Sequence, residues 1–431
     1  MNWIFLGIVL VAFATAAWRQ LAFVAVEGAQ PPMEALSAAM IASAGGAVEL
    51  AIGLVGVMAL FLGLMKVAEA GGLLTVIARL IRPLMTRLFP EVPPDHPAMG
   101  AMVLNLSANA LGLGNAATPF GIRAMQELDR LNPRPGTATN SMALFLAINT
   151  SSVTLLPTAV IALRAAAGST DPAGILPTTL FASICGTIAA VVAALWLARF
   201  FPAGTPQAGD AVIDRPWVRE NVPGEPMPAD PGGYPLWVSM LAIGALVALI
   251  PVTIAWGRTI SPWIVPGLMV VFLAFGALRG VRIYEAFVEG AKEGFRVAVR
   301  IIPYLVAILV AVGMLRASGA LDATVGAIGA YTAKFGLPPE ALPMALLRSL
   351  SGSGAYGVMA SIINDPAIGP DSYTGYLVST LQGSSETTFY VLAVYFGAVQ
   401  VRRVRHALAA ALIADLVAVV AAVAICRWLY A

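Results

Sequence analysis

Long apolar runs that alternate with short polar segments are the dominant pattern along this chain of 431 residues. Several runs, such as residues 172–198 and 231–257, contain no Asp, Glu, Lys or Arg. Most runs reach the roughly 20 residues that a helix needs to cross a hydrocarbon core. The pattern predicts an all-α polytopic membrane protein. We expect about nine transmembrane helices, near residues 2–24, 46–66, 141–163, 175–200, 236–254, 262–279, 298–316, 374–399 and 406–428.

Composition supports this fold class and argues against others. The chain is 59% hydrophobic and 11% charged, whereas about 25% of the residues of a soluble domain are charged. A net charge of +2 without a basic patch interleaved with aromatic residues argues against nucleic acid as a partner. Cys185 and Cys426 lie within apolar runs, which argues against a disulfide framework or a zinc site. No nucleophile has a base at a readable spacing, so we expect neither catalysis nor a cofactor or metal.

A proline-rich segment, residues 201–235, divides the chain into a first repeat, residues 1–200, and a second repeat, residues 236–431. We interpret the N-terminal run as a retained first helix because it lacks a basic n-region, and a cleaved signal peptide is the alternative. The two repeats share three features in the same order, which predicts a duplication. The matched features are Gly46 and Gly71 with Gly294 and Gly319, then Gly112, Gly114 and Ala117 with Gly352, Gly354 and Gly357, and last residues 149–154 with residues 382–387.

The distribution of Lys and Arg predicts that the two repeats have opposite orientations. Basic residues flank the Gly-rich element of the first repeat on both sides, whereas residues 363–373, after the matching element, contain none. Short cytoplasmic loops are enriched in basic residues, so both elements are expected to be re-entrant, from opposite faces. This arrangement places the N-terminus in the cytoplasm and the C-terminus outside, and inverted repeats are typical of secondary transporters. Residues 73–89 read either as an amphipathic helix in the interface or as a plain connecting helix.

Each Gly-rich element is unusually polar for a membrane segment. Its amides and broken backbone must be shielded by protein or face a watery cavity, and broken helix ends can bind a solute or an ion. The alternative is that small residues only permit close helix packing. A dinucleotide fingerprint is a weaker reading, because no strand or βαβ unit surrounds it. The candidate residues are Asn105, Ser107, Asn109, Gly112, Gly114, Asn115 and Thr118, with Ser351, Gly352, Ser353 and Gly354 in the second repeat.

A polar cluster also interrupts one long apolar run of each repeat. The only charge between Asp371 and Arg402 is Glu386, and a charge at the bilayer centre costs roughly 2.5 to 3.5 kcal/mol or more. We expect Glu386 to hold a proton or sodium ion or to accept a hydrogen bond from substrate, and a buried structural pair or a protonated carboxyl is the alternative. The clusters consist of Asn149, Thr150, Ser151 and Ser152, and of Gln382, Ser384, Ser385, Glu386 and Thr387.

Four other ionisable residues lie near or within the apolar runs. Asp371 is interpreted mainly as a helix N-cap. For Arg348 we leave open a role in neutralising an anion, a pair with Glu386, or snorkelling to the interface. Asp415 and Glu49 rank lower because no polar residues surround them in the sequence.

Residues 112–128 and 149–157 resemble spore maturation protein A, and residues 351–357, 369–372 and 382–397 resemble spore maturation protein B. The chain is therefore similar to an SpmA–SpmB fusion over nearly its whole length outside the proline-rich segment. Both proteins are identified as members of the nucleoside-recognition (Gate) family, which is similar to parts of concentrative nucleoside transporters and of the FeoB iron transporter. The resemblance implies a Gate-type fold in a bacterial plasma (inner) membrane. The sequence has no P-loop motif of the FeoB kind, which argues against nucleotide-driven iron uptake.

These observations favour a secondary transporter or exchanger of a polar solute, bound at mid-membrane between the repeats. One repeat is expected to rock against the other, with H⁺ or Na⁺ as the coupling ion. The alternatives are a non-transporting scaffold or accessory protein and a carrier of a lipid-linked head group. The lipid bilayer is an expected partner, and a homo-oligomer is left open.

Overall fold

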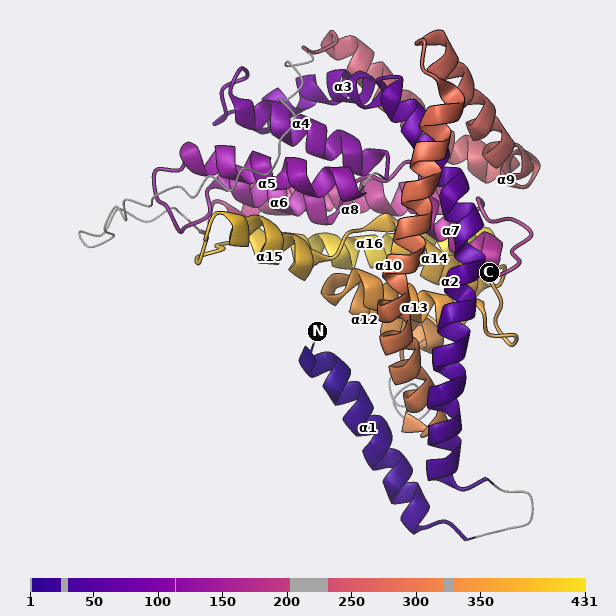
Figure 1. Ribbon diagram of the computed structural model, residues 1–431. Coiled ribbons are helices and arrows are strands. Elements are labelled where there is room, and N and C mark those ends of the chain that lie inside the picture. The colour runs from indigo at the N-terminus through magenta and orange to yellow at the C-terminus, as the bar shows by residue number, and fades with distance from the viewer. Residues whose placement is uncertain (1, 25–29, 113, 202–231, 321–328, 330) are drawn as a thin grey trace.

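The computed structural model describes every residue except 1, 25–29, 113, 202–231, 321–328 and 330 (Figure 1). The described residues are mainly helical, with one isolated bridge between Thr137 and Arg403. The first repeat contains α1 (Asn2–Leu21), α2 (Pro32–Ala70), α3 (Leu73–Leu88), α4 (Pro97–Ala110), α5 (Gly114–Arg130), α6 (Asn140–Thr150), α7 (Thr158–Ala166) and α8 (Leu176–Leu197). The second repeat contains α9 (Leu236–Leu278), α10 (Ile283–Ala317), η1 (Pro339–Ala341), α12 (Leu342–Leu350), α13 (Gly352–Ile363), α14 (Tyr373–Ser384), α15 (Thr388–Ala398) and α16 (Ala407–Tyr430).

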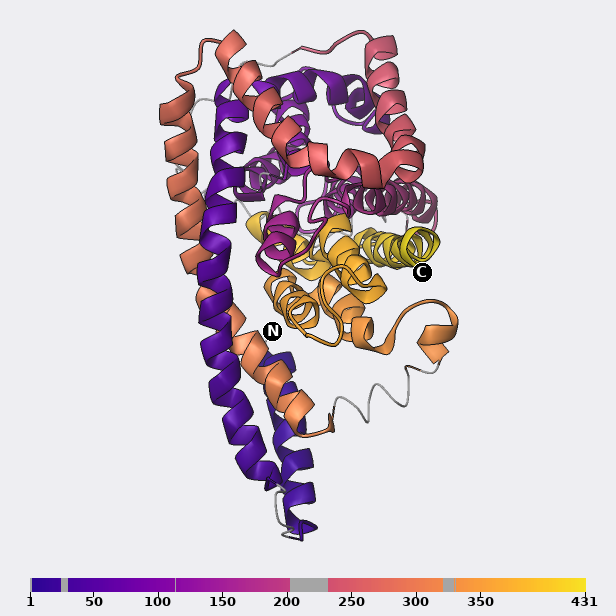
Figure 2. The same cartoon turned by 90° about the vertical axis from the view of Figure 1, so that its right-hand side faces the viewer.

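Four of the described helices, α2, α8, α10 and α16, are long and apolar enough to cross a membrane. Helices α8 and α16 have 22 and 24 residues, and at ~1.5 Å per residue they match a hydrocarbon core about 30 Å thick. Helix α2 has 39 residues and is ~58 Å long, so a strong tilt is needed to keep it within the bilayer. Figures 1 and 2 show α2 and α10 running across the direction of α8 and α16. The prediction of an all-α polytopic membrane protein is confirmed.

Matching helices of the two repeats run antiparallel. Helix α2 packs along α10, with Gly294 against the backbone of Ala59 and Gly313 against Ser43, so the residue numbers rise in opposite directions. Helix α8 packs along α16 in the same way. The hydroxyl of Tyr430 donates to the carbonyl of Gly174 over 2.7 Å before α8, and Arg405 donates to the carbonyl of Phe201 after it. This is the inverted relationship that the sequence predicts.

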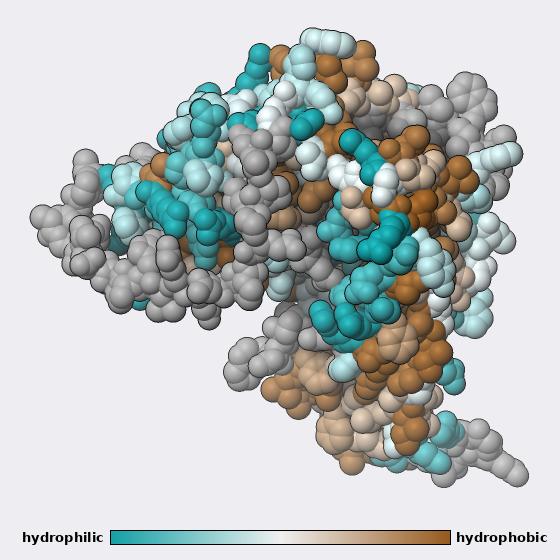
Figure 3. All heavy atoms as spheres, turned by 45° about the horizontal axis from the view of Figure 1, so that its top comes forward, coloured by the Kyte–Doolittle hydropathy of each residue, from teal (hydrophilic) through white to brown (hydrophobic). Residues whose placement is uncertain are grey.

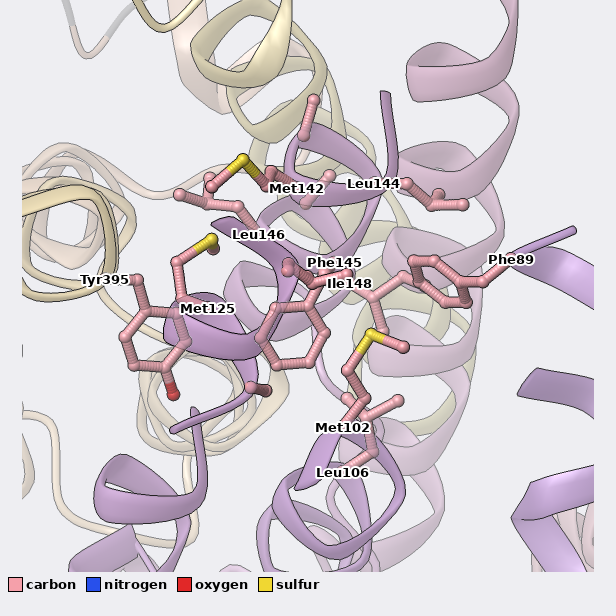
Figure 4. Close-up of a cluster of buried hydrophobic side chains, with 14 of the residues drawn as sticks. Phe89, Met102, Leu106, Met125, Met142, Leu144, Phe145, Leu146, Ile148 and Tyr395 are labelled. Carbon is pink, nitrogen blue, oxygen red and sulfur yellow. The ribbon is translucent and has the colours of Figure 1, made fainter. Parts of the chain in front are cut away.

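The two repeats interlock instead of forming separate bodies. One buried apolar cluster combines side chains of α4, α5, α6 and α8 with side chains of α15 and α16. Figure 4 shows part of it, with the rings of Phe145 from α6 and Tyr395 from α15 side by side, stacked at 6.0 Å between centroids. A second cluster combines side chains of α2, α7 and α8 with side chains of α10, α12, α13, α14 and the C-terminal half of α16. Burial of apolar surface therefore stabilises contacts between the repeats as much as contacts within them.

Several predicted helix boundaries are wrong. The predicted helix 46–66 is the central part of the longer α2, and the predicted helices 236–254 and 262–279 form one element, α9. The predicted helix 298–316 begins earlier, at Ile283 in α10. The helix continues through charged turns at the ends of α2 and α10. Hydropathy places such turns outside a membrane span, so the sequence pattern predicted helices that are too short. The amphipathic segment 73–89 is confirmed as helix α3, whereas its place in the membrane interface stays a prediction.

The two long runs that carry the polar clusters are not continuous helices, which is the most important correction. The predicted helix 141–163 breaks between Thr150 in α6 and Thr158 in α7, and the predicted helix 374–399 breaks between Ser384 in α14 and Thr388 in α15. In the first break, the hydroxyls of Thr150 and Ser151 both donate to the carbonyl of Ala147, and Pro157 lacks a backbone N–H. Such local bonds compete with the helical pattern.

The surface of the molecule separates apolar from polar regions (Figure 3). The lower projection, which holds α1 and the adjoining ends of α2 and α10, is largely apolar in this view. Polar residues gather at the left of the view and in a second patch at its centre, above the projection. The exposed apolar side chains include Ile188 on α8 and Val420 on α16, 58% and 61% exposed, as expected where a helix faces lipid.

Candidate functional site

The two broken helices cross at their breaks. The backbone N–H of Glu386, in the break of the second repeat, donates to the carbonyl of Thr150 at the end of α6 over 2.8 Å. The hydroxyl of Thr187 on α8 donates to the carbonyl of Ser151. Segments 236 positions apart, from Thr150 to Glu386, are thus joined through backbone groups that a continuous helix would have satisfied internally. The two polar clusters of the sequence therefore meet at one place.

The tip of each Gly-rich hairpin lies against the break of its own repeat. Gly112, between α4 and α5, has a φ of 74°, and a Cβ added there would lie 2.5 Å from the carbonyl oxygen of Leu156. Gly352, between α12 and α13, is so placed that a Cβ would lie 2.6 Å from Oγ1 of Thr387. The N–H of Leu155 also donates to the carbonyl of Ala110 over 2.9 Å. Glycine is required at both tips because the backbone must approach a neighbouring segment closely.

Eight helix ends therefore converge on this site. Helices α4, α6, α12 and α14 end there, and α5, α7, α13 and α15 begin there. Free N–H groups with partial positive charge and free carbonyls with partial negative charge both point into the region. Ser351 caps α13 by accepting from the N–H of Gly354 over 3.1 Å. The carboxylate of Glu386 precedes the first turn of α15, where the helix dipole favours a negative charge.

The amides of the first repeat form a hydrogen-bonded network that includes one residue the sequence analysis missed, although Oδ1 of Asn105 is buried without a partner among the described residues. The side-chain amide of Asn105 donates to the carbonyl of Ala117 over 2.7 Å and to the hydroxyl of Tyr395 over 3.1 Å. Asn109 donates to Oδ1 of Asn149 over 2.9 Å, and Tyr395 donates to the same oxygen over 3.4 Å. In the sequence, Tyr395 is an ordinary aromatic residue of an apolar run. These bonds link the first hairpin to both broken helices.

Other predicted residues of the first repeat differ in their surroundings. The hydroxyl of Ser107 donates to the carbonyl of Val103 within α4, which serves the helix itself. Ser152 is buried, and its hydroxyl has no hydrogen-bond partner among the described residues. Thr118 is half-buried on α5. The side chain of Asn115 lies outside the described part of the structure, and the backbone of Gly114 begins α5.

The polar cluster of the second repeat is also incompletely paired. Glu386 is exposed although apolar helices flank it, and Ser353 at the second hairpin tip is exposed as well. The side-chain oxygen Oε1 of Gln382 is buried without a partner in the described structure. Ser384 and Ser385 are buried, the first donating weakly to the carbonyl of Leu381 over 3.4 Å. Gly354, in the first turn of α13, packs on Ser351 and Ile308. Unpartnered buried polar atoms of this kind need a further polar group, such as water or a solute, to satisfy them.

Two buried ionisable side chains, Arg348 and Asp415, lie next to this cluster. Arg348 is 7% exposed and donates from Nη1 to the hydroxyl of Thr387 over 3.1 Å, so it is not a snorkelling residue. Asp415 on α16 is also 7% exposed, and its Oδ2 accepts from Ser349 over 2.6 Å and from Thr388 over 2.7 Å. The low rank of Asp415 rested on a lack of polar neighbours in the sequence, whereas the structure places polar side chains around it. Its polar partners come from distant segments, so its own sequence neighbours could not reveal them.

A second buried arginine, Arg164 at the end of α7, joins the repeats on the far side from the basic loops. Its guanidinium is 0% exposed, donates to the carbonyl of Pro370 over 2.7 Å and pairs with Asp371 over 3.1 Å. The interpretation of Asp371 as an N-cap is wrong, because Ser372 caps α14. Burial acts to raise the pKa of Asp371, but hydrogen bonds from Ser169 and Thr170 and the charge of Arg164 outweigh it and hold that pKa below its ordinary value.

The described residues contain no group of three or more His, Cys, Asp or Glu side chains that could hold a metal ion. The site instead offers amides, hydroxyls, broken helix ends, one exposed carboxylate and one buried Arg–Asp group. Such a set can bind a polar solute by hydrogen bonds and can carry a small cation or a proton.

Comparisons with known proteins agree with this arrangement. The family model described as nucleoside recognition (Gate) matches residues 51–167 and 298–402, which together include both hairpins and both broken helices. Spore maturation protein A of Bacillus subtilis (strain 168) is 45% identical over 160 residues, which is 37% of this chain and 82% of that protein. Spore maturation protein B of the same organism is 44% identical over 166 residues, 38% of this chain and 92% of that protein.

Two similar proteins that are separate in Bacillus subtilis thus each match a part of one chain, as a fusion predicts. A comparison with solved structures gave no match. The family match covers half of the sequence and includes the elements that build the site. This chain therefore belongs to the nucleoside recognition (Gate) family.

Proposed function

We propose that this protein is a secondary transporter or exchanger of a small polar solute. The solute would bind where the two helix breaks cross, between the tips of the two hairpins. The observation that carries the proposal is the exposed carboxylate of Glu386, whose own N–H is bonded to Thr150 of the other repeat over 2.8 Å. A polar and exposed group placed between apolar helices is costly unless water or a solute reaches it.

The interlocked architecture changes the movement that we propose. Both apolar clusters combine the two repeats, so rocking one repeat against the other would tear each cluster apart. The hairpins, the broken helices, α8 and α16 are bound together by these clusters and by the Arg164–Asp371 pair. We propose that they slide as one unit along the antiparallel α2–α10 pair, which crosses them (Figure 2). The movement is a small shear that keeps the side chains packed, because Phe61 of α2 and Ile308 of α10 belong to the second cluster.

One observation favours a scaffold or accessory role as the second candidate. In the first repeat Asn105, Asn109 and Asn149 are linked by hydrogen bonds that include Tyr395 of the second repeat, as purely structural polar residues in membranes are. This pairing is incomplete, since Oδ1 of Asn105, the hydroxyl of Ser152 and Oε1 of Gln382 are buried without a partner among the described residues. Transport is therefore the better-supported function.

The test is a ligand screen on the purified protein in lipid nanodiscs, read as thermal stabilisation. The probes are a panel of nucleosides, nucleobases, sugars and amino acids, with nucleosides first because of the family match. We expect at least one probe to stabilise the wild type and to lose its effect with Glu386→Gln and Asn149→Ala. Glu49→Gln is the matched control, since Glu49 is an exposed acid on the apolar helix α2 and lines a different cavity, between α2, α10 and α13.

The probe that stabilises the protein is then tested for uptake into proteoliposomes. Uptake and counterflow of that probe by the wild type support the proposal. Equal stabilisation of all the variants would remove the site assignment, and binding without any uptake would favour the accessory role.

A further inference from the structure

A buried acid outside the sequence-predicted site, Asp415, lies against the start of α15, two residues after Glu386. It projects from the middle of α16 and is held by hydroxyls of two other elements, Ser349 of α12 and Thr388 of α15. Both hydroxyls bond to the same carboxyl oxygen, Oδ2. The other oxygen, Oδ1, is buried and has no hydrogen-bond partner among the described residues. An ionised carboxylate has about four acceptor sites, so this environment satisfies an anion poorly.

In the part of the chain that the structure describes, Arg348 is the cation close to this acid, and it is shared between two carboxylates. Arg348 interacts electrostatically with both Glu386 and Asp415. Its Nη1 bonds to the hydroxyl of Thr387, and its Nε is buried without a partner in the described structure. One guanidinium cannot neutralise two acids in a low-dielectric interior. Uptake of one proton by either acid would make the group of three neutral.

Of the two acids, Asp415 holds that proton more favourably. Glu386 is exposed and keeps a hydrated charge, whereas Asp415 is 7% exposed. A proton on Oδ2 of Asp415 can be donated to the oxygen of Ser349 or Thr388, at 2.6 and 2.7 Å. The remaining oxygen, Oδ1, then becomes a neutral carbonyl, which tolerates the lack of a donor better than a carboxylate does.

We propose that Asp415 is a proton-binding residue and that it holds a proton at neutral pH in this conformation. The geometry of the cluster supports this proton-binding site. That the bound proton is coupled to transport rests on the proposed transport function. Movement of the second hairpin would separate Ser349 from Asp415 and expose the carboxyl to Arg348 or to water, which gives a route for proton release.

Helices α6, α8, α12, α14 and α15 pack against α16. Among the described residues, these helices and the turn before α15 carry two charged side chains, Arg348 and Glu386, and α6 has no ionisable residue. The other titratable side chains on them are Cys185 on α8, Tyr373 and Tyr376 on α14, and Tyr390 and Tyr395 on α15.

The test is infrared spectroscopy of the full chain in lipid at neutral pH, read as the C=O stretching band of a protonated carboxylic acid. No substrate is added, so the result does not depend on whether the protein transports. We expect the band in the wild type and in Glu386→Gln, and its loss in Asp415→Asn. The absence of the band in the wild type, or its loss in Glu386→Gln alone, would overturn the proposal.

Thermal stability supplies a second, independent readout. Asn is nearly isosteric with a protonated Asp, so Asp415→Asn is expected to melt at the wild-type temperature. If Asp415 were instead the anionic partner of Arg348, the same substitution would leave a buried cation with one partner fewer and lower the melting temperature. Asp415→Leu, which removes the acceptor for both hydroxyls, is the control that must be destabilised under either outcome.

Discussion

Gly112 and Gly352 occupy equivalent places at the residue scale, each packed on the helix break of its own repeat. The groups that an added Cβ would meet differ between the two glycines. Gly112 faces a backbone carbonyl and has a left-handed φ of 74°, whereas Gly352 faces the end of the Thr387 side chain. A carbonyl in a fixed backbone cannot give way, and a threonine hydroxyl can rotate. The two tips should therefore tolerate an added methyl group unequally.

We predict that Gly112→Ala destabilises the protein most. Overpacking costs about 1–3 kcal/mol, and the left-handed backbone adds about 1–2 kcal/mol for a residue with a Cβ. Gly352→Ala should lose less. Gly72→Ala should lose only the free energy of the left-handed backbone, because its φ is 85° and there is open space around it. Gly46→Ala should lose neither contribution, because an added Cβ there meets nothing within 4 Å. SDS-unfolding titrations of the four variants measure this order, and equal losses at Gly112 and Gly46 would contradict the close approach.

The Arg164–Asp371 pair predicts a specific pH dependence of stability. Because the pKa of Asp371 lies below its ordinary value of 3.8 in the folded protein, its carboxylate stabilises the fold above that pH and loses this effect as the pH falls below about 4. We expect Asp371→Asn to be less stable than the wild type at pH 7, with a difference that shrinks towards pH 3. Asp95→Asn is the control, since Asp95 is 99% exposed and its substitution should leave stability unchanged at any pH.

Residue types were predictable from the sequence, whereas their partners were not. The candidate amides and hydroxyls were found because polar groups are rare in an apolar run. Tyr395 and Asp415 act through contacts with residues 290 and 66 positions away, and local sequence does not report such contacts. Arg164 could have been noticed as a charge directly after the uncharged run 135–163, although nothing in the sequence places it beside Asp371.

At the scale of elements, the helix breaks are the feature that hydropathy misses. Residues 141–163 and 374–399 are apolar enough to read as continuous spans, because a window average is insensitive to three or four polar residues. The hairpins were predictable, since Gly-rich polar stretches cannot continue a membrane helix. The breaks expose backbone groups that two bonds across the site then satisfy, from Leu155 to Ala110 and from Glu386 to Thr150.

Hydrogen exchange resolved to single amides tests these breaks. We expect the amides of residues 152–154 to exchange much faster than those of α6, because they lie between α6 and α7. The amides of Leu155 and Glu386 should be protected, since each donates to a carbonyl over 2.9 and 2.8 Å. Uniform protection from residue 141 to 163 would instead indicate the continuous helix.

The whole molecule is an antiparallel, interlocked pair of repeats, and this arrangement predicts how the chain behaves when it is cut. Residues 1–200 and 236–431, expressed together as separate chains, should assemble and purify as one complex, because both apolar clusters need side chains from each repeat. A tag on the second repeat measures recovery of the first. Either repeat alone should be recovered in low yield, and two stable repeats that do not associate would contradict the interlock.

The inverted order could be predicted from the sequence because Gly spacing and the distribution of basic residues survive in both repeats. The interlock could not, since helices of similar hydropathy carry no signal that says which helix packs on which. The central claim at this scale is that water reaches a polar site enclosed by apolar helices. That claim depends on the exposure of Glu386.

The most direct measurement is cysteine labelling of Glu386→Cys in intact membranes with a membrane-impermeant thiol reagent, after Cys185 and Cys426 have been replaced by Ala. Val420→Cys on α16 is the matched control, because Val420 is 61% exposed on an apolar helix and should face lipid. We predict that position 386 is labelled and position 420 is not. A position 386 as unreactive as position 420 would show that no water path reaches the crossing of the two breaks, and transport through this site would be contradicted.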